Sequence, residues 1–129
     1  MTVVRTFTIA VVDDDFRVLE SLEDLFESAG HSVHSFPSAK ALLEDGCLLE
    51  IDCLIADIGM PVIDGIELQR LARAVRPELP VIFITGRHDL ADLRRAVEQG
   101  NQGFFQKPFD GPALLAAVSQ AVCNPRLRE

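Results

Sequence analysis

Short apolar segments alternate along this chain with longer segments in which apolar residues recur at helical spacing. Three apolar segments, at residues 8–12, 51–56 and 80–84, are rich in β-branched residues and contain few polar ones. This composition is typical of strands that are buried on both faces of a parallel sheet. Weaker strand candidates lie at residues 31–36 and 103–106. The pattern therefore predicts a sheet built from these strands.

The segments between the strands have the period of amphipathic helices. They lie near residues 18–29, 68–75, 90–97 and 114–122, and a shorter helix is expected at 38–45. Regular alternation of strand and helix predicts an α/β fold of the (βα)5 type, a doubly wound five-stranded parallel sheet with helices on both faces. In such a fold, binding sites lie beyond the carboxyl ends of the strands.

The composition is that of one ordinary domain. The chain has 129 residues, of which 48% are apolar, and this is enough for one buried core. We expect the domain to span residues 1–123, with residues 124–129 as a C-terminal tail or the start of a removed linker. No apolar stretch approaches the roughly 18 residues of a membrane helix, and no secretory segment follows the start. We therefore expect a cytoplasmic protein without membrane contact.

Charge and cysteine content narrow the function classes further. The formal net charge is −8, which argues against direct binding of nucleic acid. Cys47, Cys53 and Cys123 form neither a CxxC pair nor an even set for disulfides. Free thiols in a reducing compartment are the simple interpretation.

Polar side chains stand where the inner strands of the predicted sheet end. Three consecutive aspartates at 13–15 follow the first strand, and Asp57 follows the third. Thr85 ends the fourth strand, and Lys107 ends the fifth. Because parallel strands deliver their carboxyl ends to one edge of the sheet, we expect these side chains to converge there.

The converging residue types suit phosphoryl transfer. Carboxylates from two adjacent strands offer the hard oxygen ligands that Mg²⁺ prefers. An ionised carboxylate such as that of Asp57 is already a nucleophile, and a hydroxyl and an ammonium can stabilise phosphoryl oxygens. The sequence therefore predicts a magnesium-dependent phosphoryl-transfer site.

Four short motifs carry a resemblance to a known family. They are Val-Val-Asp-Asp-Asp at 11–15, Asp-Ile-Gly-Met-Pro at 57–61 followed by Asp64-Gly65, Ile-Thr-Gly at 84–86, and Phe-Phe-Gln-Lys-Pro-Phe at 104–109. In this order and spacing they resemble the response-regulator receiver domains of two-component systems, most closely the FixJ-like subgroup. The resemblance covers residues 8–122 and implies the flavodoxin-like receiver fold with strand order 2-1-3-4-5.

The resemblance implies a role for each acidic residue. Asp57 would accept the phosphoryl group and bind Mg²⁺ together with Asp14 and the backbone carbonyl of Gly59, while Asp13 would act through a metal-bound water. The third aspartate leaves a second register open, in which Asp14 and Asp15 form the acidic pair. We favour Asp13 and Asp14, because they directly follow the apolar strand and leave Asp15 to cap the first helix. Gly59 replaces a larger side chain that is common in the family, which should open the mouth of the site.

The resemblance also implies how the phosphoryl group is held and sensed. Thr85 would hydrogen-bond it and Lys107 would pair with it, and the Lys107–Pro108 peptide is commonly cis in the family. Thr85 and Phe104 are the candidate switch residues, where Phe104 takes the place of an aromatic residue whose rotamer follows phosphorylation. A plain core role for Phe104 remains an open alternative.

The function implied is that of a signalling switch in a two-component phosphorelay. A sensor histidine kinase would supply the phosphoryl group to Asp57, and the protein would catalyse only its own phosphorylation and dephosphorylation. FixJ-like members usually carry a DNA-binding output domain, which is not in this chain, so control of transcription would act through such a domain or a partner. A phosphorylation-dependent homodimer is a further expectation.

Two other function classes share parts of this pattern. A haloacid-dehalogenase-like phosphatase would use Asp13 as its nucleophile, but that family needs Thr or Val where Phe16 and Arg17 stand, and a second acidic pair where only Asp110 is found. A flavodoxin-like FMN carrier would need a phosphate-binding loop after the first strand, where the three aspartates would repel a phosphate.

Overall fold

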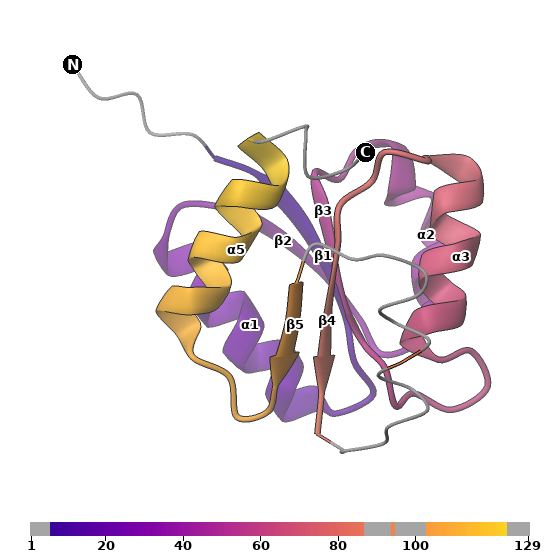
Figure 1. Ribbon diagram of the computed structural model, residues 1–129, viewed down its shortest axis with the longest axis horizontal. Coiled ribbons are helices and arrows are strands. Elements are labelled where there is room, and N and C mark those ends of the chain that lie inside the picture. Colours follow the sequence, from indigo (N-terminus) through magenta and orange to yellow (C-terminus); the bar gives the residue numbers. More distant parts are fainter. Residues whose placement is uncertain (1–5, 87–93, 95–102, 124–129) are drawn as a thin grey trace.

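The computed structural model of this protein describes residues 6–86, 94 and 103–123. These residues form a five-stranded sheet in which every neighbouring pair of strands is parallel (Figure 1). The strands are β1 (Thr8–Val12), β2 (Ser32–Phe36), β3 (Cys53–Asp57), β4 (Val81–Thr85) and β5 (Gly103–Gln106). Their order across the sheet is β2-β1-β3-β4-β5, so the predicted fold class and strand order are confirmed.

Helices cover both faces of the sheet. On one face lie α1 (Phe16–Ser28) and α5 (Gly111–Cys123), and on the other lie α2 (Ala39–Asp45), α3 (Gly65–Val75) and the short 3-10 helix η1 (Cys47–Leu49). The helix predicted near residues 90–97 lies outside the described residues. Within the described part of the chain, no helix is long and apolar enough to cross a membrane.

Alternation along the strands divides the apolar side chains between two cores. Successive residues of a strand point to opposite faces of the sheet. Ile9 and Val11 of β1 therefore pack in the core beneath α1 and α5, whereas Ala10 and Val12 pack in the core beneath α2 and α3. All residues of β3 and β4 are buried, which explains why both strands are apolar up to their last residues, Asp57 and Thr85.

Aspartate side chains cap the N-termini of two helices close to the carboxyl edge of the sheet. The Asp15 Oδ1 atom accepts a hydrogen bond of 2.9 Å from the backbone N–H of Arg17 at the start of α1. The Asp64 Oδ1 atom accepts one of 2.8 Å from the N–H of Glu67 at the start of α3. Such caps satisfy backbone donors that a helix leaves unpaired. The caps thus fix where α1 begins after β1 and where α3 begins after the loop that follows β3.

The three cysteines are free thiols, as predicted. Cys47 and Cys53 are buried, and Cys123 is exposed on α5. Burial raises the pKa of Cys47 to about 11 and that of Cys53 to about 12, so both remain protonated thiols at neutral pH.

Candidate functional site

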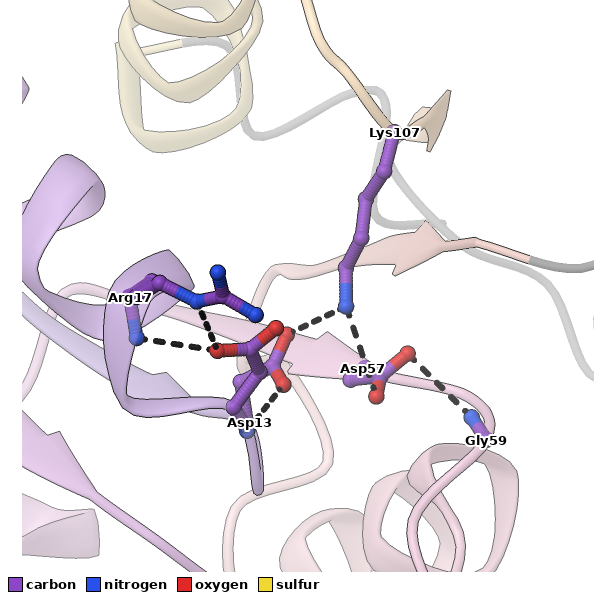
Figure 2. A network of polar contacts seen from close by, with 6 residues as sticks. Asp13, Arg17, Asp57, Gly59 and Lys107 are labelled. Atoms are coloured by element: carbon purple, nitrogen blue, oxygen red, sulfur yellow. Dashed lines mark hydrogen bonds and ion pairs between the residues drawn. The ribbon is translucent and has the colours of Figure 1, made fainter.

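Three aspartates from two neighbouring strands meet at the carboxyl edge of the sheet. β1 and β3 run side by side with Val12 opposite Ala56. Asp13 directly follows β1, and Asp57 is the last residue of β3, so the two carboxylates lie next to one another (Figure 2). One carboxylate oxygen each from Asp13, Asp14 and Asp57 lie within 4.8 Å of one another. The cluster combines two buried carboxylates with the exposed Asp14.

The side chain of Lys107 reaches into this cluster from the end of β5. Its Nζ atom lies 2.6 Å from Asp13 Oδ2 and 3.6 Å from Asp57 Oδ2 (Figure 2). The lysine follows β5 directly, and its backbone N–H donates to the Thr85 carbonyl oxygen at 2.7 Å. The peptide bond between Lys107 and Pro108 is cis, as the family resemblance predicted. A single ammonium group therefore faces two carboxylates.

Backbone donors orient the two buried carboxylates. The N–H of Asp15 donates to Asp13 Oδ1 at 2.8 Å, and the N–H of Gly59 donates to Asp57 Oδ1 at 3.2 Å. The Asp13 side chain is 0% exposed and that of Asp57 is 8% exposed. Because these bonds hold the Oδ1 atom of each carboxylate, the Oδ2 atom of each faces Lys107.

The position of Asp15 bears on the two registers of the aspartate triplet. Its carboxylate caps α1, and its N–H supports Asp13. The group of carboxylates close enough to share a cation consists of Asp13, Asp14 and Asp57. The geometry therefore favours the register in which Asp13 and Asp14 form the acidic pair.

Thr85 and Phe104 lie on the two strands beyond β3. Asp57 pairs in register with Ile84, so Thr85 stands one position farther along β4 toward the carboxyl edge. Thr85 is 6% exposed. Phe104 is partly buried, lies opposite Phe83 in the sheet, and packs against the core beneath α2 and α3. Thr85 thus borders the aspartate cluster, while Phe104 contacts one of the two cores.

Burial makes the two inner carboxylates hard to ionise. Desolvation raises the pKa of Asp13 and that of Asp57, and the contacts with Lys107 offset this only in part. The charge of Asp57 adds to the rise at Asp13, and the charge of Asp14 adds to the rise at Asp57. Burial by itself lowers the pKa of Lys107, but its hydrogen bond to Asp13 and the charge of Asp57 outweigh burial and raise it. When all of its carboxylates are ionised, the site therefore carries more negative charge than its one ammonium balances.

This excess of negative charge fits a divalent cation. Three carboxylates that converge within reach of one ion match the oxygen ligands that Mg²⁺ takes, with water completing the octahedron. Gly59 is exposed, and a Cβ atom added to it would lie no closer than 4.0 Å to its nearest neighbour, Asp57 Oδ1. The mouth of the site is thus open on that side.

Asparagine at position 57 should stabilise the fold in the absence of divalent ions. A carboxyl group whose pKa is raised by folding destabilises the folded state above that pKa, and the penalty fades as the pH falls through it. We expect Asp57→Asn to raise the free energy of unfolding at neutral pH by more than the roughly 0.5 kcal/mol of a surface substitution. Denaturant titrations followed by far-UV circular dichroism over a pH series measure this gain. It should shrink toward acid pH, and the exposed Asp24→Asn should show no such trend.

A strained residue lies in the loop between β3 and α3. Val62 has a φ of 68°, in the left-handed region that a β-branched residue rarely adopts, and its side chain is fully exposed. Nothing in the pattern of the sequence indicated this conformation. Strain of this kind is typical of loops that serve a functional site.

Glycine at position 62 should therefore stabilise the protein. Val62→Gly removes the left-handed strain and sacrifices no buried surface, so we expect the free energy of unfolding to rise by about 1 kcal/mol. Urea unfolding provides the measurement. The matched control is Val75→Gly, also an exposed valine but at the end of α3, where the same change should lower stability. A loss of stability in both variants would contradict the argument from strain.

Beside the cluster, a hollow of about 530 Å³ separates the start of α1 from the segment after β5. Lys107 and Arg17 are among the residues that line it. Arg17 is not among the site residues predicted from the sequence, because it is the one base in the predominantly acidic run of residues 13–27 and belongs to none of the four motifs.

Comparisons with known proteins agree with the site. Residues 9–119 match the family described as the response regulator receiver domain. The chain is 38% identical over 118 residues to the response regulator protein TodT of Pseudomonas putida, covering 92% of this chain and 52% of TodT. It is 40% identical over 114 residues to the transcriptional regulatory protein FixJ of Azorhizobium caulinodans, covering 88% and 54%. A response regulator receiver domain protein from Clostridium thermocellum has a similar structure, with a TM-score of 0.84, 27% identity, and coverage of 95% and 99%.

The chain spans about half the length of the curated relatives that it matches. Neither the family match nor these relatives support the phosphatase alternative. Receiver domains generally bind Mg²⁺ at an acidic pocket and are not enzymes in the ordinary sense. With the family matched over residues 9–119 and relatives of the FixJ kind at this level of identity, the chain belongs to the response regulator receiver domains of two-component systems.

Proposed function

We propose that this receiver domain takes a phosphoryl group from a sensor histidine kinase onto Asp57, in a reaction that requires Mg²⁺. The observation that carries the proposal is the contact of Lys107 with both Asp13 and Asp57 at the end of the sheet, with Asp14 beside them. A nucleophilic carboxylate, an acidic pair and an ammonium are the parts that phosphoryl transfer needs.

The acidic residues would hold the metal. Asp14, Asp57 and the backbone carbonyl of Gly59 would bind it directly, and Asp13 would bind it through a water. The pKa values of Asp13 and Asp57 are raised, so a cation would relieve unfavourable charge in the folded protein. When bound, Mg²⁺ neutralises charge on the transferring phosphoryl group.

The remaining residues would receive the phosphoryl group. A carboxylate oxygen of Asp57 attacks phosphorus, the bond from phosphorus to the donor atom breaks, and the donor leaves with that electron pair. Lys107 then exchanges its contact with the carboxylates for one with a phosphoryl oxygen, and Thr85 donates its hydroxyl to another. Hydrolysis of the acyl phosphate would reset the switch, so the domain catalyses only its own phosphorylation and dephosphorylation.

The phosphoryl group would act on the rest of the protein through charge. It adds about −1.5 to −2 units at the sheet edge. Movement of Thr85 toward it would be followed by Phe104, which packs in the core beneath α2 and α3. An equilibrium between two conformations of the domain that differ by a few kcal/mol in free energy can be shifted in this way.

The names of two relatives support a proposal for the wider role of this switch. TodT is named a response regulator protein, and FixJ a transcriptional regulatory protein. We propose a cytoplasmic receiver at residues 1–123, followed by a tail or linker at 124–129, that controls transcription through a DNA-binding output domain or a partner. A homodimer formed on phosphorylation fits the same scheme.

Mass spectrometry of the intact protein tests the proposal. Incubation with acetyl phosphate and Mg²⁺ should add one phosphoryl group, a gain of about 80 Da, to the wild type. The gain should disappear without Mg²⁺ and in Asp57→Asn, and should persist in Asp24→Asn, a control on the exposed face of α1. Absence of any adduct on the wild type would sink the proposal. Repeated turnover of a phosphate ester that needs Asp13 and not Asp57 would point to a phosphatase instead.

A further inference from the structure

The hollow beside the aspartate cluster gives a route to the ammonium of Lys107. The residues that line it are Asp15, Arg17, Val18 and Ser21 from the start of α1, together with Gly86, Lys107, Pro108 and Phe109. Its volume of about 530 Å³ exceeds what a phosphoryl group alone would fill. A small donor molecule can therefore rest in the hollow with its phosphoryl group beside Lys107, whose Nζ atom lies 3.6 Å from Asp57 Oδ2.

Arg17 holds a positive charge at this hollow. Its backbone N–H donates to Asp15 Oδ1, and its Nε atom lies 3.7 Å from the same oxygen. The side chain is 90% exposed, and the dashed lines in Figure 2 connect its Nε atom and its backbone N–H to one carboxylate oxygen, that of Asp15. Asp15 thus restrains the inner part of the guanidinium, while its outer nitrogens remain exposed to solvent.

The surroundings of Arg17 are strongly acidic. Residues 13–27 contain seven acids, and Arg17 is their one base. The ammonium of Lys107 is already engaged by Asp13 at 2.6 Å. This acidic run repels an anionic donor that approaches Asp57, and Arg17, although paired with Asp15 on one side, is the one cation within the run.

We propose that Arg17 binds small acyl phosphates at this hollow and pairs with the carboxylate that leaves. This inference rests on the proposed phosphorylation of Asp57. A carboxylate oxygen of Asp57 forms the new bond to phosphorus, the bond from phosphorus to the acyl oxygen breaks, and the acyl group departs as a carboxylate that carries the electron pair. No proton is transferred, so the departing negative charge needs a cation, which Arg17 supplies.

The size of the effect follows from Coulomb's law. A donor charge of about −2 at roughly 8 Å from one positive charge in water is favoured about fivefold. At an ionic strength of about 0.01 M, screening over this distance is weak, because the Debye length is about 30 Å. We therefore expect Arg17→Gln to lower the second-order rate of phosphorylation by acetyl phosphate about fivefold at low salt, and less at high salt.

A second phosphodonor distinguishes pairing of Arg17 with the leaving carboxylate from a general effect of the substitution on phosphorylation. Phosphoramidate at neutral pH is a zwitterion, and its leaving group departs as neutral ammonia when the bond from phosphorus to nitrogen breaks. Arg17→Gln should therefore change the rate with phosphoramidate much less than the rate with acetyl phosphate. Arg17→Lys, which keeps the charge, should retain most of the acetyl phosphate rate. The matched control is Arg70→Gln, an exposed arginine on α3 that pairs with Glu67.

Intact-mass time courses with both donors and all four proteins give the rates, and thermal unfolding confirms that each variant is folded. A selective loss with acetyl phosphate in Arg17→Gln, rescued in Arg17→Lys, supports the role of Arg17. An unchanged acetyl phosphate rate in Arg17→Gln overturns it, as does an equal loss with both donors or in Arg70→Gln. In each of those cases the wild type is still phosphorylated, and the proposed function is retained. If the wild type accepts no phosphoryl group from either donor, the proposed function itself is wrong.

Discussion

Methionine at position 107 is expected to lower the free energy of unfolding by about 3 kcal/mol at neutral pH. Lys107 places its ammonium 2.6 Å from the Asp13 carboxylate, which has no exposure to solvent. Removal of one partner from a buried ion pair leaves the other charge without compensation, which costs about 3–5 kcal/mol. The lower end applies here, because the lysine side chain is 20% exposed and Asp13 can take up a proton instead. Urea unfolding followed by far-UV circular dichroism measures the loss.

The loss in Lys107→Met should depend on pH in a defined direction. Desolvation already raises the pKa of Asp13, and without the ammonium it will rise further. An acid whose folded pKa is raised destabilises the fold above that pKa, and stability returns as the pH falls through it. The deficit should therefore be larger near pH 8 than near pH 5.

A matched lysine separates this effect from a simple change in net charge. Lys40 is exposed on α2, and Lys40→Met should alter stability by no more than about 0.5 kcal/mol at either pH. An equal deficit for Lys107→Met at both pH values would contradict the buried-pair explanation. Such a result would assign the loss to packing of the lysine stem against its neighbours, such as Gly86.

The fold could be predicted because the central strands are buried on both faces. Every residue of β3 and β4 is buried, so their sequences are apolar up to the polar residue that ends each strand. The sequence pattern predicted the end of β3 less accurately. The apolar pattern stops at Ala56, but the strand continues through Asp57, which pairs with Ile84. A carboxylate within a strand breaks the apolar pattern that identifies the strand.

The convergence of Asp13, Asp57 and Lys107 was predictable for a topological reason. Parallel strands bring their carboxyl ends to one edge, so residues that follow different strands meet there whatever their separation in sequence. Features that depend on the exact path of the backbone or on the placement of a single exposed side chain were not predictable. The left-handed Val62 and the approach of Arg17 to the hollow belong to this class, because no local pattern of residues encodes them.

The largest effect of a single added methyl group is expected at Gly65, the first residue of α3. A Cβ atom there would lie 2.5 Å from the carbonyl oxygen of Asp57 and 2.9 Å from its carbonyl carbon. The N–H of Gly65 also donates to the Ile58 carbonyl oxygen at 3.2 Å, so the start of α3 rests directly on the end of β3. The backbone of the proposed phosphoacceptor is therefore in contact with a position where only glycine fits.

Alanine at position 65 must push the helix start and the strand end apart. Because the obstructing atoms belong to the backbone and cannot rotate away, we expect Gly65→Ala to cost about 2–3 kcal/mol of unfolding free energy. The displacement also moves Asp57 relative to Lys107, so phosphorylation by acetyl phosphate should slow by about tenfold or more even where the variant is fully folded. Urea unfolding and intact-mass time courses measure the two effects.

Gly59 provides the matched control for this prediction. It lies in the same motif, two residues beyond Asp57, but an added Cβ atom would meet no atom closer than 4.0 Å. Gly59→Ala should therefore change stability by no more than about 0.5 kcal/mol when no divalent ion is present. Equal stabilities for the two alanine variants would show that the backbone at the junction of β3 and α3 accommodates a Cβ atom without loss of unfolding free energy. The position of Asp57 would then not depend on the glycine that follows Asp64.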